Sequence, residues 1–349
     1  MALNISREIG QKNVYPKKIL GPGAIVKNNG KAHYLSGATG PMTQPQTGLW
    51  NVYAPDFSLK DRQPWWSYKH INEIDLESAD PEGLSFVEPD FVQFEEQYNK
   101  FQEGFRGGSL KKIVPVVFST SSVGAIESFI LKRLSFLSQN QSEALIPYGM
   151  WSKVDGIIGL TPELLFKVEG RKLTTMALAG TAHGTYTSDP AFFSDPKENA
   201  EHDIVVNSLV EQLSSFGKVA IGKKTIHRLP LIKHLKTSLE VELNDDIDFE
   251  QIVQKLHPTP ALGVYPNDQL EVWEEELSPG FDRRRYGAPF GWIDPQGNFE
   301  CYVAIRNIQW MNSSIFLGSG CGIVPESDLG REWDELRMKR DHVRGILGL

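Results

Sequence analysis

The chain has 349 residues, of which 40% are hydrophobic and 23% charged, and its formal net charge is −8. This length and composition are those of a water-soluble globular protein with a sizeable core. The acidic balance argues against a general nucleic-acid binder, which carries a basic face, but it leaves room for a locally positive pocket that takes an anionic substrate.

Two cysteines, Cys301 and Cys321, are too few for a disulfide framework, and no CxxC pair suggests zinc. The first residues lack the apolar segment of a secretory signal, and no run approaches the roughly 18 apolar residues of a membrane span. We therefore expect a cytoplasmic protein that contacts neither membrane nor nucleic acid, and we take it to be a monomer.

The residue patterns predict an α+β fold. Residues 1 to about 90 favour short strands and loops that form a lid or a wrapping layer. Helical spacing and capping residues predict helices over 91–104 and 126–137, from the N-cap Asp195 to a stop at Gly217, and from about Asp328 onward. Runs of β-branched residues and turn residues predict strands over 111–119, 164–168, 172–178, 290–293, 299–310 and 314–324.

The absence of any linker predicts one domain over residues 1–349, with a variable N-terminal part to about residue 100 and a catalytic core over about 105–345. Hairpins with helices interspersed favour large, mostly antiparallel sheets flanked by helices. Pro115 lies inside one predicted strand, which places that strand at a sheet edge or a bulge. Pro196 suits the first helical position, and Glu198 completes a capping-box-like pattern.

Two predicted helices each carry a pair of carboxylates on the apolar face. At about 100° per residue, Glu198 and Glu201 continue one apolar stripe, and Glu332 and Glu335 continue the other. A buried carboxylate costs free energy unless it is paired or holds a metal. The two pairs together favour an oxygen-rich Mg²⁺ site. The alternative is that Glu198 only caps its helix and that Glu335 pairs with Lys339 on a solvated surface.

Single residues add weaker signals. Lys112 opens an apolar strand, where a lysine is more often an edge residue than a catalyst. Arg306 interrupts the uncharged strand CYVAIRNIQW, and a buried arginine usually has an anionic partner. His234 and His257 are each more typical of hydrogen-bonded core histidines. Glycine-rich stretches that let the backbone approach a ligand, without a nucleotide motif, lie at 177–181 and 318–322.

Eight ordered segments between residues 110 and 340 carry a more specific signal. They are LKKIV at 110–114, GLTPELLFKVEGRKLTTMALAGT at 159–181, DPKENAEHD at 195–203, IKHLKTSL at 232–239, LHPTPALG at 256–263, FDRRRYGAPFGW at 281–292, VAIRN at 303–307 and GSGCGIVPESDLGREWDELRMK at 318–339. In this order they resemble the chorismate-binding enzyme family, which includes isochorismate, salicylate, anthranilate and aminodeoxychorismate synthases. The first hundred residues match the family only loosely.

The resemblance implies a fold like that of the family, chorismate as the substrate and Mg²⁺ as the cofactor. It implies that Glu201 and Glu335, with Glu198 and Glu332 nearby, hold Mg²⁺ and through it the ring carboxylate. The residues it implies for contact with chorismate are Gly180, Thr181, His234, Ala261, Leu262, Arg306, Gly320 and Lys339.

The resemblance also implies an acid and a base. Isochorismate synthases add water at C2 of the ring and expel the C4 hydroxyl, which requires one group that takes a proton and another that gives one. Glu163 would be the general acid and Lys112 the general base. An ordinary lysine has a pKa near about 10.4, so the pKa of Lys112 would have to be lowered.

Three residues narrow the subfamily. Family members that use ammonia usually have glutamine in place of Lys112, and aminodeoxychorismate synthases usually have lysine in place of Ala179. Anthranilate and salicylate synthases more often have threonine in place of Ala261. We therefore expect an isochorismate synthase that serves menaquinone or siderophore synthesis. A salicylate synthase, which goes on to eliminate pyruvate, and a non-catalytic chorismate-binding protein are the alternatives, and Lys112 together with Glu163 argues against the latter.

Overall fold

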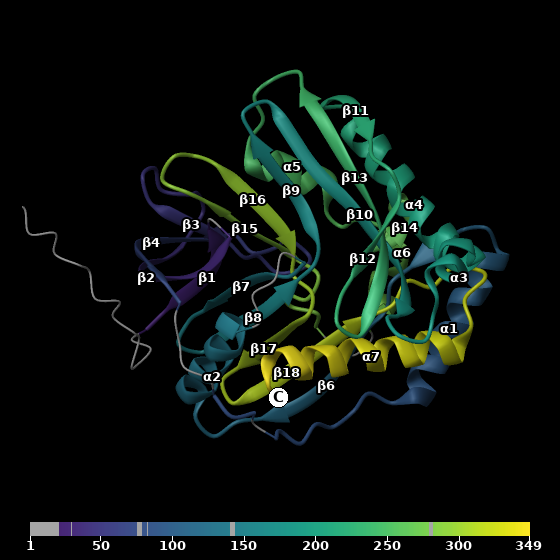
Figure 1. The fold of residues 1–349 in the computed structure, drawn as a ribbon, viewed down its shortest axis with the longest axis horizontal. Coiled ribbons are helices and arrows are strands. Elements are labelled where there is room, and N and C mark those ends of the chain that lie inside the picture. Colours follow the sequence, from purple (N-terminus) through teal and green to yellow (C-terminus); the bar gives the residue numbers. More distant parts are fainter. Residues whose placement is uncertain (1–20, 29, 75–78, 82, 140–143, 279–281) are drawn as a thin grey trace, which may run out of the picture.

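The computed structural model describes residues 21–28, 30–74, 79–81, 83–139, 144–278 and 282–349 (Figure 1). In this part of the chain the helices are α1 Phe91–Arg106, α2 Ile126–Gln139, α3 Asp189–Ser194, α4 Pro196–Leu213, α5 Phe249–Leu256, α6 Leu270–Trp273 and α7 Leu329–Leu347. The strands are β1 Gly23–Asn28, β2 Lys31–Met42, β3 Trp50–Tyr53, β4 Trp65–Glu73, β5 Lys112–Ile113, β6 Val116–Ser122, β7 Ile146–Trp151, β8 Asp155–Thr161, β9 Leu164–Glu169, β10 Lys172–His183, β11 Gly217–Ile221, β12 Thr225–Arg228, β13 Ile232–Leu243, β14 Val264–Tyr265, β15 Pro289–Ile293, β16 Phe299–Val303, β17 Asn307–Met311 and β18 Ser314–Gly320.

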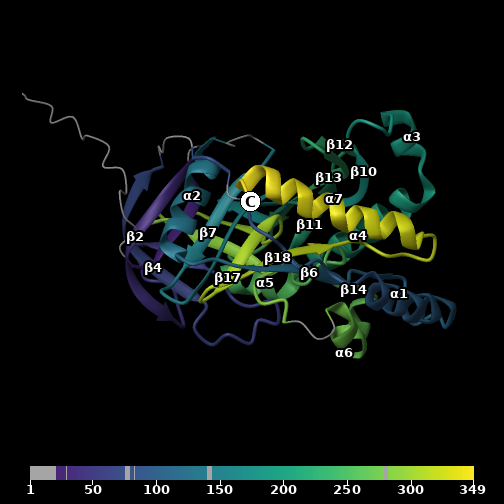
Figure 2. The ribbon, with the colours of Figure 1, turned by 90° about the horizontal axis from the view of Figure 1, so that it is seen from below.

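Within the described residues, one sheet of 16 strands runs in the order β11-β13-β10-β9-β16-β15-β3-β4-β2-β1-β7-β8-β17-β18-β6, with β12 against β13. Neighbouring strands are antiparallel, as in the long β10–β13 and β6–β18 ladders. Helix α4 packs on β10 and β13, and α7 packs on β18 and α2 (Figures 1 and 2). The predicted α+β fold with a large, mostly antiparallel sheet flanked by helices is confirmed.

The local helix signals hold. The predicted helices over 91–104, 126–137, after Asp195 and from 328 are α1, α2, α4 and α7. Asp195 caps α4, since its side chain accepts hydrogen bonds from the backbone of the second and third helical residues. The predicted stop at Gly217 was wrong. The helix ends at Leu213, a turn follows in which the Phe216 amide donates to Leu213, and Gly217 opens β11 opposite Leu243.

Two predicted strands are broken. The strand over 111–119 divides into β5 and β6 around Pro115, and β6 is the last strand in the order, so the edge position that Pro115 predicts is confirmed. The strand over 299–310 divides into β16, which pairs with β9 and β15, and β17, which pairs with β8 and β18. Arg306 lies at this break with φ 54°, so the prediction of a continuous strand through Arg306 was wrong.

The N-terminal part is no wrapping layer where the structure describes it. Strands β1 to β4 lie in the middle of the strand order and connect the two halves of the sheet. Their Trp and Tyr side chains are buried, among them Trp65 and Tyr68. Burial of these aromatic side chains makes the segment part of the core, and residues 1–20 lie outside the described part of the chain.

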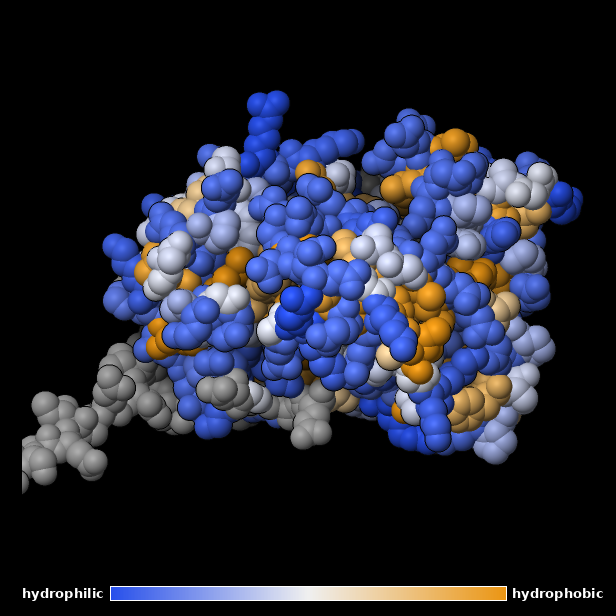
Figure 3. Space-filling model, turned by 90° about the horizontal axis from the view of Figure 1, so that it is seen from above, coloured by the Kyte–Doolittle hydropathy of each residue, from blue (hydrophilic) through white to orange (hydrophobic). Residues whose placement is uncertain are grey.

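The surface is mixed. Figure 3 shows a mainly hydrophilic face on which apolar side chains gather in small, separate groups. Large apolar side chains that are well exposed, such as Val87, Tyr186 and Val272, come from distant parts of the sequence. Among the described residues, no helix has both the length and the apolar character needed to cross a membrane.

Candidate active site

The candidate residues meet where the strand ladders are interrupted. Glu163 lies in the crossing from β8 to β9, and Arg306 lies in the crossing from β16 to β17. Backbone hydrogen bonds link the two crossings, because the Val303 amide donates to the Glu163 carbonyl and the Leu160 amide donates to the Arg306 carbonyl. At such an interruption the side chains no longer alternate between the two faces of the sheet, and side chains from several strands can therefore point toward one place.

A third interruption lies in β10. Its pairing with β13 shifts register between Ala179 and Thr181, and Gly180 between them has φ 78°, a conformation that favours glycine. The cavity at this point contains nine of the predicted site residues, namely Glu163, Thr181, Glu201, His234, Ala261, Leu262, Arg306, Gly320 and Lys339.

The cavity is small, at about 40 Å³. A small-molecule site usually offers roughly 300 Å³ or more, so side chains that line this cavity have to move when a ligand enters. A larger cavity of about 550 Å³ lies between the β1–β2 turn and β9, β15 and β16, and it contains none of the predicted site residues. The convergence of charged side chains, and not the volume, identifies the smaller cavity as the candidate site.

One side of the cavity is cationic. Arg306 is 3% exposed. Among the described residues, no carboxylate lies close enough to its guanidinium group, at roughly 4 Å or less, to form an ion pair. Its Nη2 lies 3.1 Å from His234 Nε2, and its Nε has no hydrogen-bond partner. Lys339 adds a second cation, with Nζ 2.7 Å from the Gly320 carbonyl oxygen and 2.6 Å from Glu335 Oε1.

His234 is buried and neutral. Burial and the Arg306 charge hold its pKa well below the usual range. Because the guanidinium donates to Nε2, the proton belongs on Nδ1, which lies 3.2 Å from the Gly180 carbonyl oxygen and 3.1 Å from Thr181 Oγ1. His234 therefore fixes the guanidinium of Arg306 against the irregular part of β10.

Glu163 has the electrostatics of a proton donor. The residue is 5% exposed. Burial raises the pKa of Glu163 to about 7, although the charges of Lys112 and Arg306 oppose this rise. A carboxyl group with such a pKa is half protonated near neutral pH, which suits a general acid.

Lys112 is fully buried beside the cavity. Its Nζ lies 3.1 Å from Glu201 Oε1. Burial lowers the pKa of Lys112, which is the direction that a general base requires, while Glu201 opposes the change. Gly322 lines the cavity beside this pair, and a Cβ there would lie 2.0 Å from Glu201 Oε1 and 2.9 Å from Lys112 Cε. Glycine at this position keeps the passage from Lys112 to the cavity open.

The four predicted metal ligands face inward from the first two turns of α4 and of α7. Glu198, Glu201, Glu332 and Glu335 are between 1% and 6% exposed. This overturns the interpretation of a solvated surface, although the predicted i,i+4 pair of Glu335 with Lys339 forms at 2.6 Å in the interior. The capping-box-like prediction for Glu198 also fails, because its Oε2 accepts a hydrogen bond of 2.6 Å from the Thr181 amide and not from its own helix cap.

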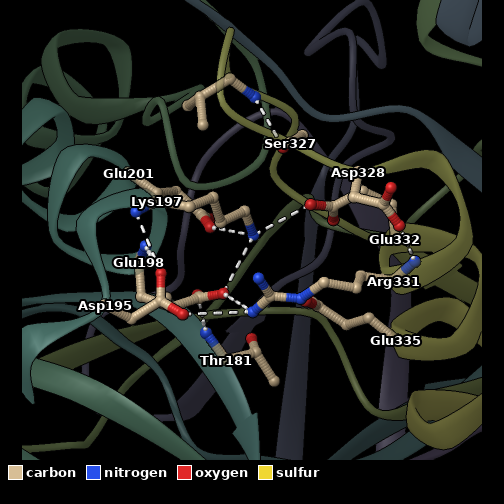
Figure 4. A network of polar contacts seen from close by, with 12 residues as sticks. Thr181, Asp195, Lys197, Glu198, Glu201, Ser327, Asp328, Arg331, Glu332 and Glu335 are labelled. Carbon is tan, nitrogen blue, oxygen red and sulfur yellow. Dashed lines mark hydrogen bonds and ion pairs between the residues drawn. The ribbon is translucent and has the colours of Figure 1, made fainter. Parts of the chain in front are cut away.

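A lysine lies among these carboxylates. Lys197 Nζ is 3.4 Å from Glu198 Oε1, 3.2 Å from Glu201 Oε2 and 3.1 Å from Glu332 Oε1. Figure 4 shows its ammonium group between the carboxylates of α4 and those of α7. At the rim, Arg331 reaches Glu198 Oε1 at 3.5 Å and is itself largely exposed.

Burial disfavours the charged form of two of the four carboxylates, even with ammonium groups nearby. Burial raises the pKa of Glu198 to about 8 and that of Glu332 to about 7, although Lys197 opposes both changes. For Glu201, burial acts in the same direction, but Lys112 and Lys197 outweigh it and hold its pKa well below the usual range. A cluster that retains protons at neutral pH favours the binding of a further cation.

The chemistry of the donors fits Mg²⁺, which prefers carboxylate oxygens. The present arrangement is not that of a metal shell. Among the described residues, no three His, Cys, Asp or Glu side chains are placed to hold a metal ion together. Lys197 occupies the space between the carboxylates instead.

Comparison with known proteins identifies the family. Residues 61–348 match the sequence profile of the chorismate-binding enzymes. The chain belongs to the chorismate-binding enzyme family. It is 33% identical over 201 residues to the salicylate biosynthesis isochorismate synthase of Pseudomonas aeruginosa, an alignment that covers 54% of this chain and 41% of that protein. Isochorismate synthase EntC of Escherichia coli is 31% identical over 202 residues, which cover 55% of this chain and 51% of EntC.

The chain thus spans about half the length of the curated relatives it matches, or less. The structural likeness covers more of each chain than these sequence alignments do. The menaquinone-specific isochorismate synthase MenF of Escherichia coli superposes with a TM-score of 0.77 at 18% identity, covering 95% of this chain and 90% of MenF. Anthranilate synthase component I of Streptococcus pneumoniae superposes with a TM-score of 0.70 at 16% identity, covering 99% of this chain and 95% of the other. The likeness covers an isochorismate synthase and an anthranilate synthase alike and, at 18% and 16% identity, shows the fold alone.

Sequence reasoning missed three residues of this family member's site. Lys197 stands four residues before Glu201, and that i,i+4 spacing could have identified it. Tyr286 is buried and lines the cavity, and it lies in the segment 281–292 that resembles the family. Gly322 was seen only as part of a glycine-rich stretch.

His257 is a core histidine, as the sequence favoured. Its Nε2 lies 2.7 Å from the Phe57 carbonyl oxygen, and it does not line the cavity. Burial lowers its pKa to about 4, so the ring is neutral.

Proposed function

We propose that this chorismate-binding enzyme is an isochorismate synthase that depends on Mg²⁺. The observation that carries the proposal is Arg306, a buried guanidinium that lines the cavity and has no carboxylate partner among the described residues. A buried cation of this kind needs an anion, and chorismate carries two carboxylates. The names of the curated relatives, which include isochorismate synthases, support the same substrate and reaction.

The residues divide the reaction between them. Arg306 and Lys339 bind the substrate carboxylates. Lys112 takes a proton from water as the water oxygen bonds to C2 of the ring. The ring double bonds shift, the C4–oxygen bond breaks, and Glu163 gives its proton to the departing hydroxyl group, which leaves as water. The product is an isomer of the substrate, and a proton then returns from Lys112 to Glu163.

The electrostatic coupling of the acid and the base supports this assignment. The Lys112 charge lowers the pKa of Glu163, and the Glu163 charge raises that of Lys112, so the two groups lie within each other's field. In the proposed reaction one loses a proton as the other gains one, and the coupling favours such opposite changes.

Glu201 and Glu335, with Glu198 and Glu332 nearby, would hold the metal. When bound, Mg²⁺ supplies positive charge that neutralises a substrate carboxylate and polarises the ring. The raised pKa values of Glu198 and Glu332 support a cation at this place, because a bound cation would stabilise the charged form that burial disfavours.

The absence of hydroxyl and amine groups at two positions supports an isomerase. Ala179 and Ala261 both line the cavity, where related subfamilies that build or cleave other bonds usually have lysine or threonine. Neither methyl group can donate or accept a proton against the ring. The proposed reaction therefore stops at isochorismate.

Incubation of the full chain with chorismate and Mg²⁺, followed by chromatographic separation of the products, tests the proposal. Isochorismate should accumulate with the wild-type protein and not with Lys112→Ala. Lys111→Ala, which removes the exposed neighbouring lysine, is the matched control and should retain activity. Unchanged chorismate in the presence of well-folded wild-type protein and Mg²⁺ would contradict the proposal and leave a binding protein.

A further inference from the structure

We propose that Lys197 is a built-in competitor of the divalent cation: its ammonium group fills the carboxylate cluster in the metal-free protein and withdraws when the cation binds. The proposal rests on the metal site of the proposed function, and it assigns to Lys197 a role in setting the affinity of that site.

Geometry makes the two cations mutually exclusive. Lys197 Nζ lies 3.1 to 3.4 Å from oxygens of Glu198, Glu201 and Glu332, which belong to two different helices (Figure 4). Mg²⁺ binds oxygen ligands at about 2.0–2.1 Å. An ion shared by these carboxylates would therefore occupy the space that the ammonium group now holds, and the two positive charges would repel each other at short range.

The metal-free protein needs a cation here. Four buried carboxylates without a cation would be costly, and the removal of one partner of a buried ion pair is strongly destabilising. Lys197 contacts three of them, and Lys112 and Lys339 each contact one, so Lys197 is the main cation of the cluster among the described residues.

Lys197 is placed so that it can leave. It is the second residue of α4, and Arg331, which like Lys197 contacts Glu198 Oε1, is 61% exposed. Its charge is carried on a flexible four-carbon side chain. Withdrawal requires no movement of the helix backbone. The carboxylate side chains, which α4 and α7 carry, then have to close in to reach the shorter Mg²⁺–oxygen distance.

Competition lowers the apparent metal affinity. When a site is free for only a fraction of the time, the apparent Kd rises by the inverse of that fraction. If Lys197 is withdrawn in roughly 1–10% of the metal-free molecules, a typical population for a minor state, its removal should tighten Mg²⁺ binding by about ten- to a hundredfold.

The test uses the full chain, freed of metal with EDTA and dialysed, and titrated with MgCl₂ by calorimetry. Lys197→Met keeps the length of the side chain and removes its charge. Lys224→Met is the matched control, because Lys224 contacts Asp203 and Asn199 of the same helix outside the cluster. Lys197→Met should bind Mg²⁺ about tenfold or more tightly than wild type and have a lower Tm without metal that Mg²⁺ restores. The control should match wild type in both.

A second measurement needs no variant and covers a failure of Lys197→Met to fold. The wild-type protein is treated with an amine-acylating reagent with and without Mg²⁺, and the labelled lysines are identified by mass spectrometry. Labelling of Lys197, which is 5% exposed, should rise when Mg²⁺ is added.

The outcomes separate this proposal from the metal site itself. Equal or weaker Mg²⁺ binding by Lys197→Met, or unchanged protection of Lys197 at saturating Mg²⁺, would overturn the competition and leave the metal site standing. Binding by Lys197→Met and none by wild type would support it. Absence of binding by both proteins would overturn the competition and the metal site together.

Discussion

Replacement of Glu163 by glutamine should stabilise the protein at alkaline pH while it strongly lowers turnover. Burial raises the pKa of the folded Glu163 carboxyl from the ordinary value of 4.5 to about 7. The folded protein therefore keeps a proton on Glu163 at pH values where the unfolded chain has lost it. Stability from this proton is fully present below about pH 4.5 and is lost as the pH rises through about 7.

The size of the effect follows from the same two values. The interval from 4.5 to about 7, at about 1.4 kcal/mol for each pH unit, amounts to about 3 kcal/mol. Glutamine has the shape of the protonated acid and does not ionise. The free energy of unfolding of Glu163→Gln, relative to wild type, should therefore increase by about 2 to 3 kcal/mol between pH 5 and pH 8.

Equilibrium unfolding in urea, with EDTA present, measures this difference. Glu198 and Glu332 also have raised pKa values, so the pH profile of the wild type alone does not isolate Glu163. The difference between wild type and variant does. Glu169→Gln removes an exposed carboxylate from the other end of β9 and should shift stability equally at both pH values. A constant difference between Glu163→Gln and wild type from pH 5 to pH 8 would refute the reasoning.

Three further outcomes are expected. Lys112→Ala and Glu163→Gln should each lower turnover by roughly two to four orders of magnitude, measured at saturating chorismate, while chorismate still binds; near-normal turnover would mean that the role is misassigned. Chelation should abolish activity and added Mg²⁺ should restore it, whereas turnover that survives thorough chelation would remove the metal from the mechanism. Gly322→Ala, whose methyl group would lie 2.0 Å from Glu201 Oε1, should lower kcat by more than tenfold by displacing Glu201 and Lys112, and an unchanged kcat would show that the passage is wider than the structure indicates.

Local signals were enough to predict the helices that hold the carboxylates. Helix caps such as Asp195 and Asp328, and apolar stripes, depend only on residues that are close in sequence. The helices α4 and α7 and the inward direction of Glu201 and Glu335 could therefore be predicted.

The crossings could not be predicted in the same way. The break before Arg306 depends on β16 and β17 pairing with different partners, β9 and β15 on one side and β8 and β18 on the other. Those partners lie far away in sequence, and a continuous apolar run conceals the break. The resemblance to the family named Glu163 and Arg306, but only the fold shows that both stand at such crossings.

The position of Lys197 shows the same limit. Its spacing from Glu201 is local, but its contact with Glu332 requires α4 and α7 to approach each other, and these helices are more than a hundred residues apart in the chain. Charge balance within a buried cluster is set by tertiary packing, which periodicity in one helix does not reveal.

Pyruvate release during chorismate turnover tests the central claim most directly. Wild-type protein, chorismate and Mg²⁺ are mixed at neutral pH with lactate dehydrogenase and its nicotinamide cofactor, and pyruvate and salicylate fluorescence are followed together. Chorismate should fall to an equilibrium with isochorismate while neither signal rises on the same time scale, because Ala261 offers no hydroxyl group against the ring. Pyruvate that appears in step with the loss of chorismate, with salicylate fluorescence rising alongside, would contradict the isomerase and establish a salicylate synthase.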